Sequence, residues 1–194
     1  MATDPSSASA ADPYAVPKAK VADAVHAAEG ETAYFPVSLL KLGIMSVATF
    51  NVYQIYWSYK NWKSAQRLAN SNANAPIRAF FYGLTSYWLF NHIREHAQGA
   101  APGVSLPAGQ LALGVLVLAL AANLPDPYWL VTLLGFLPLL PVQTAVNRVN
   151  RQLAPEADPN ARFGGWNIAG VILGGLLVAL AVFGVFAQGN ASPG

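Results

Sequence analysis

Long apolar stretches alternate with short polar connections along most of the 194-residue chain. Residues 42–59, 106–124, 128–147 and 166–187 contain no charged side chain, and each stretch is at least 18 residues long. At 1.5 Å of helix per residue, 18 residues reach about 27 Å, close to the roughly 30 Å hydrocarbon core of a bilayer. The pattern predicts an all-α, polytopic membrane protein with about four transmembrane helices.

Aromatic residues crowd the end of the first apolar stretch, where residues 49–62 read T-F-N-V-Y-Q-I-Y-W-S-Y-K-N-W. They recur at helical spacings of three and four and lead into basic residues, which is typical of an amphipathic helix at a membrane surface. Trp and Tyr favour the headgroup level, and Lys and Arg face the lipid phosphates. We predict that the following residues anchor this helix at the interface: Tyr53, Tyr56, Trp57, Tyr59, Lys60, Trp62, Lys63 and Arg67.

Polar residues interrupt the same stretch at Thr49, Asn51 and Gln54. After Gly, Asn is among the residues that best tolerate the left-handed backbone conformation found at helix ends. We therefore predict a hinge at Thr49 and Asn51, where the first helix ends or bends. A first helix that spans would put the N-terminus outside, and a reversal at Asn51 would put it inside; we favour the outside.

Residues 79–93 form a further uncharged segment between Arg78 and Arg94. As a helix they would extend only about 22 Å, so we predict a short, partly buried helix, with a membrane crossing as the alternative. Without a crossing here, every Arg lies on one side of the membrane and the turn at Asp126 lies on the other. The positive-inside rule makes the Arg side cytoplasmic and places the C-terminus outside.

The pattern divides the chain into six parts. They are an N-terminal tail (1–33), an aromatic and basic membrane module (34–99), a transmembrane hairpin (100–147), a cytoplasmic loop (148–165), a last transmembrane helix (166–187) and a C-terminal tail (188–194). The N-terminal tail mixes acidic residues with Ala, Ser and Pro and lacks the apolar core of a signal peptide, so we expect it to be disordered.

Composition narrows the possible functions. Only 10% of the residues are charged and 54% are hydrophobic, whereas an ordinary soluble domain has roughly 25% charged residues. The net charge of +2, without a dense basic run, argues against nucleic-acid binding. The absence of cysteine excludes disulfides, thiolate catalysis and cysteine-bound metals. No phosphate loop or nucleophile motif is present, so we expect no cofactor.

One stretch has the form of a metal-binding motif. Residues 92–96 read H-x-x-E-H, which on a helix puts His92 and His96 on one face with Glu95 beside them. A third ligand would have to come from a distant acid. We therefore treat these three residues as weak metal candidates and favour an interfacial helix end with no metal.

Small residues recur four positions apart in the last apolar stretch. Gly170 and Gly174 form a G-x-x-x-G pair, and Gly175 and Ala179 form a second small pair. Such spacing lets another helix approach closely. We expect these residues to pack against a helix of the same chain, with self-association as the alternative.

Uncharged polar residues lie within the apolar stretches, whereas charged residues are absent from their centres. Active transporters usually need charged groups at that depth, so a proton-coupled carrier is disfavoured. The uncharged set would either line a polar pocket or form hydrogen bonds between helices. It comprises Asn51, Gln54, Gln110, Asn123, Gln143, Thr144 and Asn147.

Residues 34–96 resemble a family of small, uncharacterised bacterial multi-pass membrane proteins, a domain of unknown function. The family shares a Thr-x-Gly-x-Tyr-x-x-Tyr-Trp-x-Tyr pattern followed by basic residues, and here the pattern occupies residues 49–59 with Lys60 and Lys63 behind it. Asn51 stands where the family has glycine. The resemblance implies a bacterial inner-membrane location and brings no known activity, cofactor or partner.

These observations favour a non-catalytic accessory or scaffold protein of the bacterial inner membrane, with its basic loops in the cytoplasm. Its expected partners are membrane lipid, through anionic headgroups, and another membrane protein or a second copy of itself, bound through residues 34–96. A small channel or facilitator is the first alternative. A metal-dependent membrane enzyme that uses the H-x-x-E-H stretch is the second.

Overall fold

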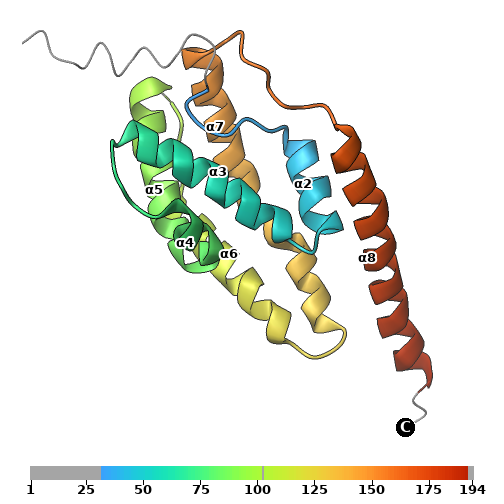
Figure 1. Ribbon diagram of the computed structural model, residues 1–194. Helices are drawn as coiled ribbons and strands as arrows, with labels where there is room; N and C mark the ends of the chain where they lie inside the picture. The colour runs from blue at the N-terminus through green and yellow to red at the C-terminus, as the bar shows by residue number, and fades with distance from the viewer. Residues whose placement is uncertain (1–31, 102, 192–194) are drawn as a thin grey trace, which may run out of the picture.

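The computed structural model describes residues 32–101 and 103–191, and in that part of the chain every regular element is a helix (Figure 1). The predicted all-α class is confirmed. The predicted disordered tail, apart from its last two residues, lies outside the described residues. The helices are α2 (Leu39–Ala48), α3 (Val52–Leu68), α4 (Ala75–Phe80), α5 (Tyr82–Ala100), α6 (Ala108–Leu120), η1 (Ala121–Asn123), η2 (Tyr128–Phe136), α7 (Leu139–Leu153) and α8 (Gly165–Ala191).

The helices α3, α5, α6 and α7 form the body of the molecule. Helix α5 packs against α6, α7 and α3, and α4 packs on α3, while α8 runs along the outside and contacts α2 (Figure 1). The largest buried side chains belong to Tyr34, Trp57, Phe90, Leu42 and Leu89. The core is therefore centred where α3, α5 and α7 meet the segment that precedes α2.

The predicted first transmembrane helix is broken in two. Ser38 caps α2 by accepting a hydrogen bond from the Lys41 amide, and the helix ends after ten residues at Ala48. Phe50 and Asn51 then have positive φ angles of 48° and 68°, and α3 turns back toward the end of the molecule where α2 begins (Figure 1). Residues 42–59 therefore do not form one spanning helix. The reason for placing the N-terminus outside, which was a first helix that spans the membrane, no longer holds.

Only two described helices are long and apolar enough to cross a membrane, against the four that the pattern predicts. They are Tyr128–Leu153, which combines η2 with α7, and Gly165–Ala187 within α8. The other two apolar helices, Leu39–Ala48 and Ala108–Asn123, are shorter. Their lengths are set by the reversal at Asn51 and by Pro107 and Pro125, which bracket the second.

Two further boundaries differ from the prediction. The segment 79–93 belongs to two helices that meet at Phe81, and α5 continues to Ala100 while burying Leu89, Phe90 and Ile93 against the body. The predicted loop 148–165 is shorter, because α7 continues to Leu153 and α8 begins at Gly165. The basic residues at the start of that predicted loop therefore lie on a helix.

Candidate functional site

The non-helical segment 32–38, which we call the strap, leads into α2 and buries the side chains of Ala33, Tyr34 and Val37. Most of the hydrogen bonds to its backbone N–H and carbonyl groups come from side-chain amides and not from a neighbouring strand. Asn150 accepts from the Tyr34 amide and donates to the Tyr34 carbonyl, both at 3.0 Å. Asn61 accepts from the Phe35 amide at 3.3 Å, and Gln143 donates to the Phe35 carbonyl at 3.2 Å.

Two more asparagines hold the second half of the strap. Asn160 donates to the Pro36 carbonyl at 3.0 Å, and Asn147 donates to the Val37 carbonyl at 2.9 Å. A buried extended chain needs such partners because an unsatisfied backbone group is costly. The amides that bind the strap, which we call the amide clasp, come from α3, α7 and the 154–164 connection, so the strap ties these three parts together.

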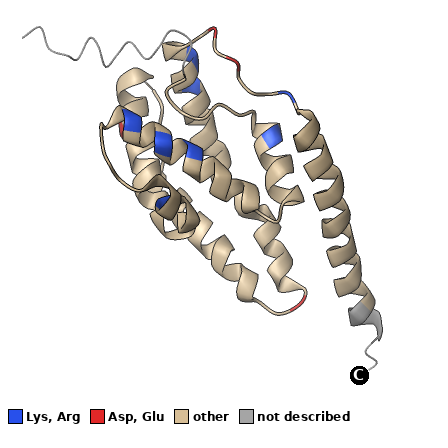
Figure 2. Cartoon of the chain, in the orientation of Figure 1, with Lys and Arg blue, Asp and Glu red and all other residues tan. Residues whose placement is uncertain are grey.

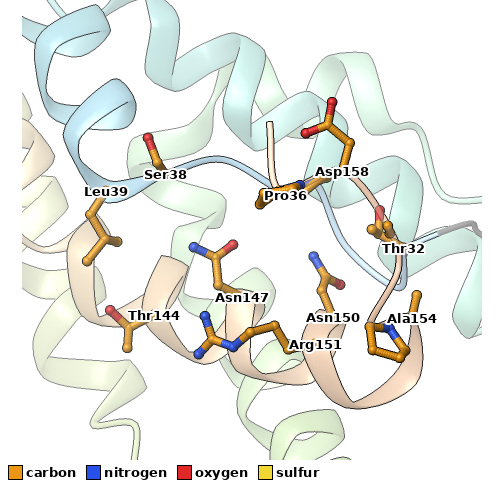
Figure 3. Close-up of a pocket in the computed structure, with 13 residues that line it drawn as sticks. Thr32, Pro36, Ser38, Leu39, Thr144, Asn147, Asn150, Arg151, Ala154 and Asp158 are labelled. Carbon is orange, nitrogen blue, oxygen red and sulfur yellow. The ribbon is translucent and has the colours of Figure 1, made fainter. Parts of the chain in front are cut away.

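A cavity of about 320 Å³ lies on the α7 side of the strap (Figure 3). Figure 3 shows Asn147 and Asn150 rising from α7 toward the strap, with Arg151 beside them. Asp158, from the connection to α8, lines the same cavity. One cation and one anion therefore border it, so its charge is close to balanced.

A second cavity, of about 390 Å³, lies on the α3 side of the strap. Three cations line it, Lys60, Lys63 and Arg67, and no acidic side chain is among the described residues that line it. Arg67 donates to the carbonyl of Thr32 at 2.7 Å, and the Lys60 ammonium lies 5.7 Å from the centroid of the Phe35 ring. The strap thus forms one wall of a cationic pocket, the name used below for this cavity.

The charged residues are distributed unevenly over the molecule. In Figure 2, Lys and Arg lie on α3, α4 and α7, near the start of α2 and just before α8. Acidic colour marks the connection between α7 and α8 and also the turn between α6 and η2. Asp126 supplies that acidic turn. The other described acidic residues, Glu95, Glu156 and Asp158, lie on α5 and in the α7–α8 connection. Acidic residues are therefore found near both ends of the molecule, whereas the described Lys and Arg lie away from the Asp126 turn (Figure 2).

The predicted interface anchors divide into two groups. The side chains of Tyr53, Trp57 and Trp62 are buried within the protein, and the Trp57 indole donates to Gln143 at 2.6 Å. These three rings therefore face neighbouring helices in the structure, whereas the prediction places them at the headgroup level. The other five anchors, Tyr56, Tyr59, Lys60, Lys63 and Arg67, are exposed or half-buried.

The predicted hinge residues make specific contacts at the reversal. The Thr49 hydroxyl donates to the Met45 carbonyl at 2.7 Å and accepts from the Tyr53 amide at 2.9 Å, which joins the end of α2 to the start of α3. The Asn51 amide donates to the Thr132 carbonyl at 2.7 Å, and Gln54 donates to Asn51 at the same distance. The reversal is thus fixed to η2 by uncharged polar groups.

The small residues of α8 that were predicted to pack against another helix do not form one continuous packing surface. A β-carbon at Gly174 would overlap the Ala48 carbonyl, so this glycine lets α8 pack against the end of α2. Nothing lies within 4 Å of the equivalent position at Gly170 or Gly175, and the exposure of Ala179 is high. Only one of the four predicted packing residues is therefore held closely against a helix of the same chain.

The H-x-x-E-H residues also separate. His92 and His96 are half-buried and their rings contact Tyr34, with centroid separations of 6.4 and 5.5 Å, whereas Glu95 is exposed. Within the described residues, no group of three or more His, Cys, Asp or Glu side chains is placed to hold a metal ion. The triad of His92, Glu95 and His96 that the motif suggests is therefore not assembled.

Comparison with known proteins identifies no relative. No family model, curated protein or solved structure matches the chain.

The sequence pattern did not single out three of the residues that build the site. Asn61, Asn150 and Asn160 bind the strap, yet they lie on surfaces or loops that the pattern marks only as polar. A usable signal was the run of Asn and Gln spaced along α7 at positions 143, 147 and 150. That spacing of four and three places all three amides on one face of a helix.

Proposed function

We propose that this chain is a non-catalytic accessory protein of the bacterial inner membrane, and that its cationic pocket binds the phosphate of an anionic lipid headgroup. The observation that carries the proposal is the pocket itself, in which Lys60, Lys63 and Arg67 line one cavity beside the strap. Several cations that line one cavity attract a phosphate together. The cavity beside α7 is a weaker candidate because Asp158 offsets the charge of Arg151.

The surface of α8 supports a membrane location. Large apolar side chains along this helix are exposed, including Ile172 at 68%, Leu173 at 62% and Phe183 at 72%. A contiguous apolar surface of this kind is costly in water and favourable in lipid. Placing α8 across the bilayer brings the cationic end, with Lys60 and Lys63, to one membrane surface.

The positive-inside rule makes that surface cytoplasmic. Juxtamembrane Lys and Arg are attracted to the anionic lipids of the cytoplasmic leaflet by about 1 kcal/mol each. The location of the pocket and the sign of its charge are therefore consistent with one role, in which the protein is positioned by anionic lipid while it supports another membrane component.

The proposal is tested by lipid selectivity in reconstituted vesicles. Spin-labelled phosphatidylglycerol and phosphatidylcholine report the fraction of each lipid that the protein immobilises. We expect wild type to retain phosphatidylglycerol preferentially and the preference to weaken with added salt. The K60Q/K63Q variant should lose most of the preference, because both substituted side chains line the pocket.

The matched control is R148Q/R162Q, which also removes two positive charges but at exposed positions that do not line the cationic pocket. It should keep the preference. Equal loss in both double variants would mean that the net charge, and not the pocket, selects lipid. An unchanged preference in K60Q/K63Q would contradict the headgroup site.

A further inference from the structure

The described part of the chain begins at the wall of the cationic pocket. Thr32 is its first residue and lines that pocket. Arg67 donates to the carbonyl groups of Thr32 and Ala33, at 2.7 and 3.3 Å. These two bonds hold the start of the strap against α3. The residues that precede Thr32 in the sequence are therefore attached to the chain beside the pocket.

The residues that precede Thr32 are acidic. Residues 21–31 contain Asp23, Glu29 and Glu31 and neither Lys nor Arg. Successive Cα atoms are about 3.8 Å apart, and three residues extend at most about 11 Å. The backbone of Glu31 thus lies next to that of Thr32, and Glu29 is within about 11 Å of it. Covalent geometry alone keeps these two acids near the pocket.

The lysines of the pocket retain hydrogen-bond donors for an anion. The Lys60 ammonium lies 5.7 Å from the centroid of the Phe35 ring, and the Lys63 ammonium lies 5.9 Å from that of the Tyr59 ring. An ammonium has three N–H donors, so contact with one ring face leaves donors for a carboxylate. The pocket and residues 21–31 are therefore complementary in charge, with three cations on one side and three acids on the other.

We propose that the acidic segment 21–31 binds the cationic pocket through Glu29 and Glu31 and competes with the lipid phosphate for Lys60 and Lys63. The inference rests on the proposed function and adds a regulator of the same site. A tethered ligand acts at a high effective concentration, on the order of millimolar for a short linker, so weak carboxylate contacts suffice. A membrane rich in anionic lipid displaces the segment, whereas a neutral membrane leaves it in place.

The first test repeats the lipid-selectivity measurement on the full chain carrying E29Q/E31Q. Removing both carboxylates should raise the preference for phosphatidylglycerol about twofold to thirtyfold, the range that two exposed ion pairs contribute. In the K60Q/K63Q background the same two substitutions should have no effect, because the lysines for which they compete are gone.

The matched control is D4N/D12N, which also removes two acids but near the start of the chain. It should leave the preference unchanged. A gain in E29Q/E31Q that persists without the two lysines, or that D4N/D12N reproduces, would mean that net charge sets the preference. Either result would overturn the proposal.

The second test does not depend on a lipid site. A zero-length carbodiimide joins carboxylates to amines that touch, here in the full chain in neutral detergent. We expect mass spectrometry to find Glu29 or Glu31 joined to Lys60 or Lys63 within one chain, and added short-chain phosphatidylglycerol to suppress the link. Absence of the link would overturn this proposal even if wild type prefers phosphatidylglycerol. A link without any such preference would overturn the lipid site, while the contact between segment and pocket would stand.

Discussion

Asn150 binds both backbone polar groups of Tyr34 with one side-chain amide, although 116 residues separate them in sequence. Its oxygen accepts from the Tyr34 N–H and its nitrogen donates to the Tyr34 carbonyl, each at 3.0 Å. A β-strand neighbour would offer the same pair of bonds. A helical protein thus holds an extended segment as a sheet would, through a side chain of α7.

Replacing this amide should be costly. In Asn150→Ala both Tyr34 groups are left buried without partners, so we expect a loss of about 2 to 4 kcal/mol in the free energy of unfolding. Thermal or denaturant unfolding in detergent measures it. Thr144→Val, on an exposed part of the same helix, is the matched control and should change stability by less than about 0.5 kcal/mol. A similar loss of unfolding free energy in both variants would show that the Asn150 amide does not stabilise the fold through the strap.

The reversal at Asn51 predicts an order among substitutions. Asn51→Gly fits the positive φ but loses two side-chain hydrogen bonds, which should cost about 1 to 3 kcal/mol. Asn51→Ala loses the same bonds and adds about 1 kcal/mol of left-handed strain. Unfolding of both variants measures the difference. Alanine matching or exceeding glycine in stability would mean that the left-handed turn is absent in the membrane.

The contact between α8 and α2 predicts different effects of substitutions at three glycines. Gly174→Ala should lower the unfolding midpoint, because its β-carbon would overlap the Ala48 carbonyl and push the helices apart. Gly170→Ala and Gly175→Ala should leave the midpoint unchanged or raise it, since nothing lies near either position. Equal behaviour of all three variants would indicate that α8 does not pack on α2 in the bilayer.

Acid should destabilise the protein. The pKa values of His92 and His96 are lowered on folding, so the unfolded chain binds more protons as the pH falls below the unperturbed value of about 6.5. We expect the unfolding midpoint to fall from neutral pH toward pH 5 and the fall to be smaller in H92Q/H96Q. If H92Q/H96Q had the same pH dependence as wild type, the acid destabilisation would come from other groups.

The charge distribution predicts a membrane orientation. The chain has no cysteine, so single cysteines at Ser71, Arg148 and Asp126 can be labelled without background. Impermeant reagents should reach Ser71→Cys and Arg148→Cys from the cytoplasmic side and Asp126→Cys from the other. A reporter fused after Gly194 should share the side of Asp126. Finding Ser71 and Gly194 on one side would contradict this topology.

The local elements followed from the sequence more closely than the packing did. A helix end near Thr49 and Asn51 and a long apolar helix near residues 166–187 are local properties that few neighbouring residues decide. The structure has α2 ending at Ala48 and α8 starting at Gly165. The number of spans did not follow, because hydropathy does not distinguish a helix that crosses from one that turns back.

The site itself was largely beyond the reach of the sequence. Gln143 and Asn147 were expected either to line a pocket or to join helices, and the structure shows both bonded to the strap. That the strap is their partner could not be inferred, because it depends on how chain segments more than 100 residues apart are packed. Trp57 was assigned to the membrane surface because burial against protein and burial in lipid favour the same residue type.

The amide clasp also has a consequence for the order of events during synthesis. The strap is made early, whereas Asn150 is made 116 residues after Tyr34. At 5 to 20 residues per second, this interval lasts roughly 6 to 23 s. During that time the strap lacks its main partners and its aromatic rings lack their buried site. The first described segment to leave the ribosome is thus among the last to reach its final position, and closing the fold waits for α7.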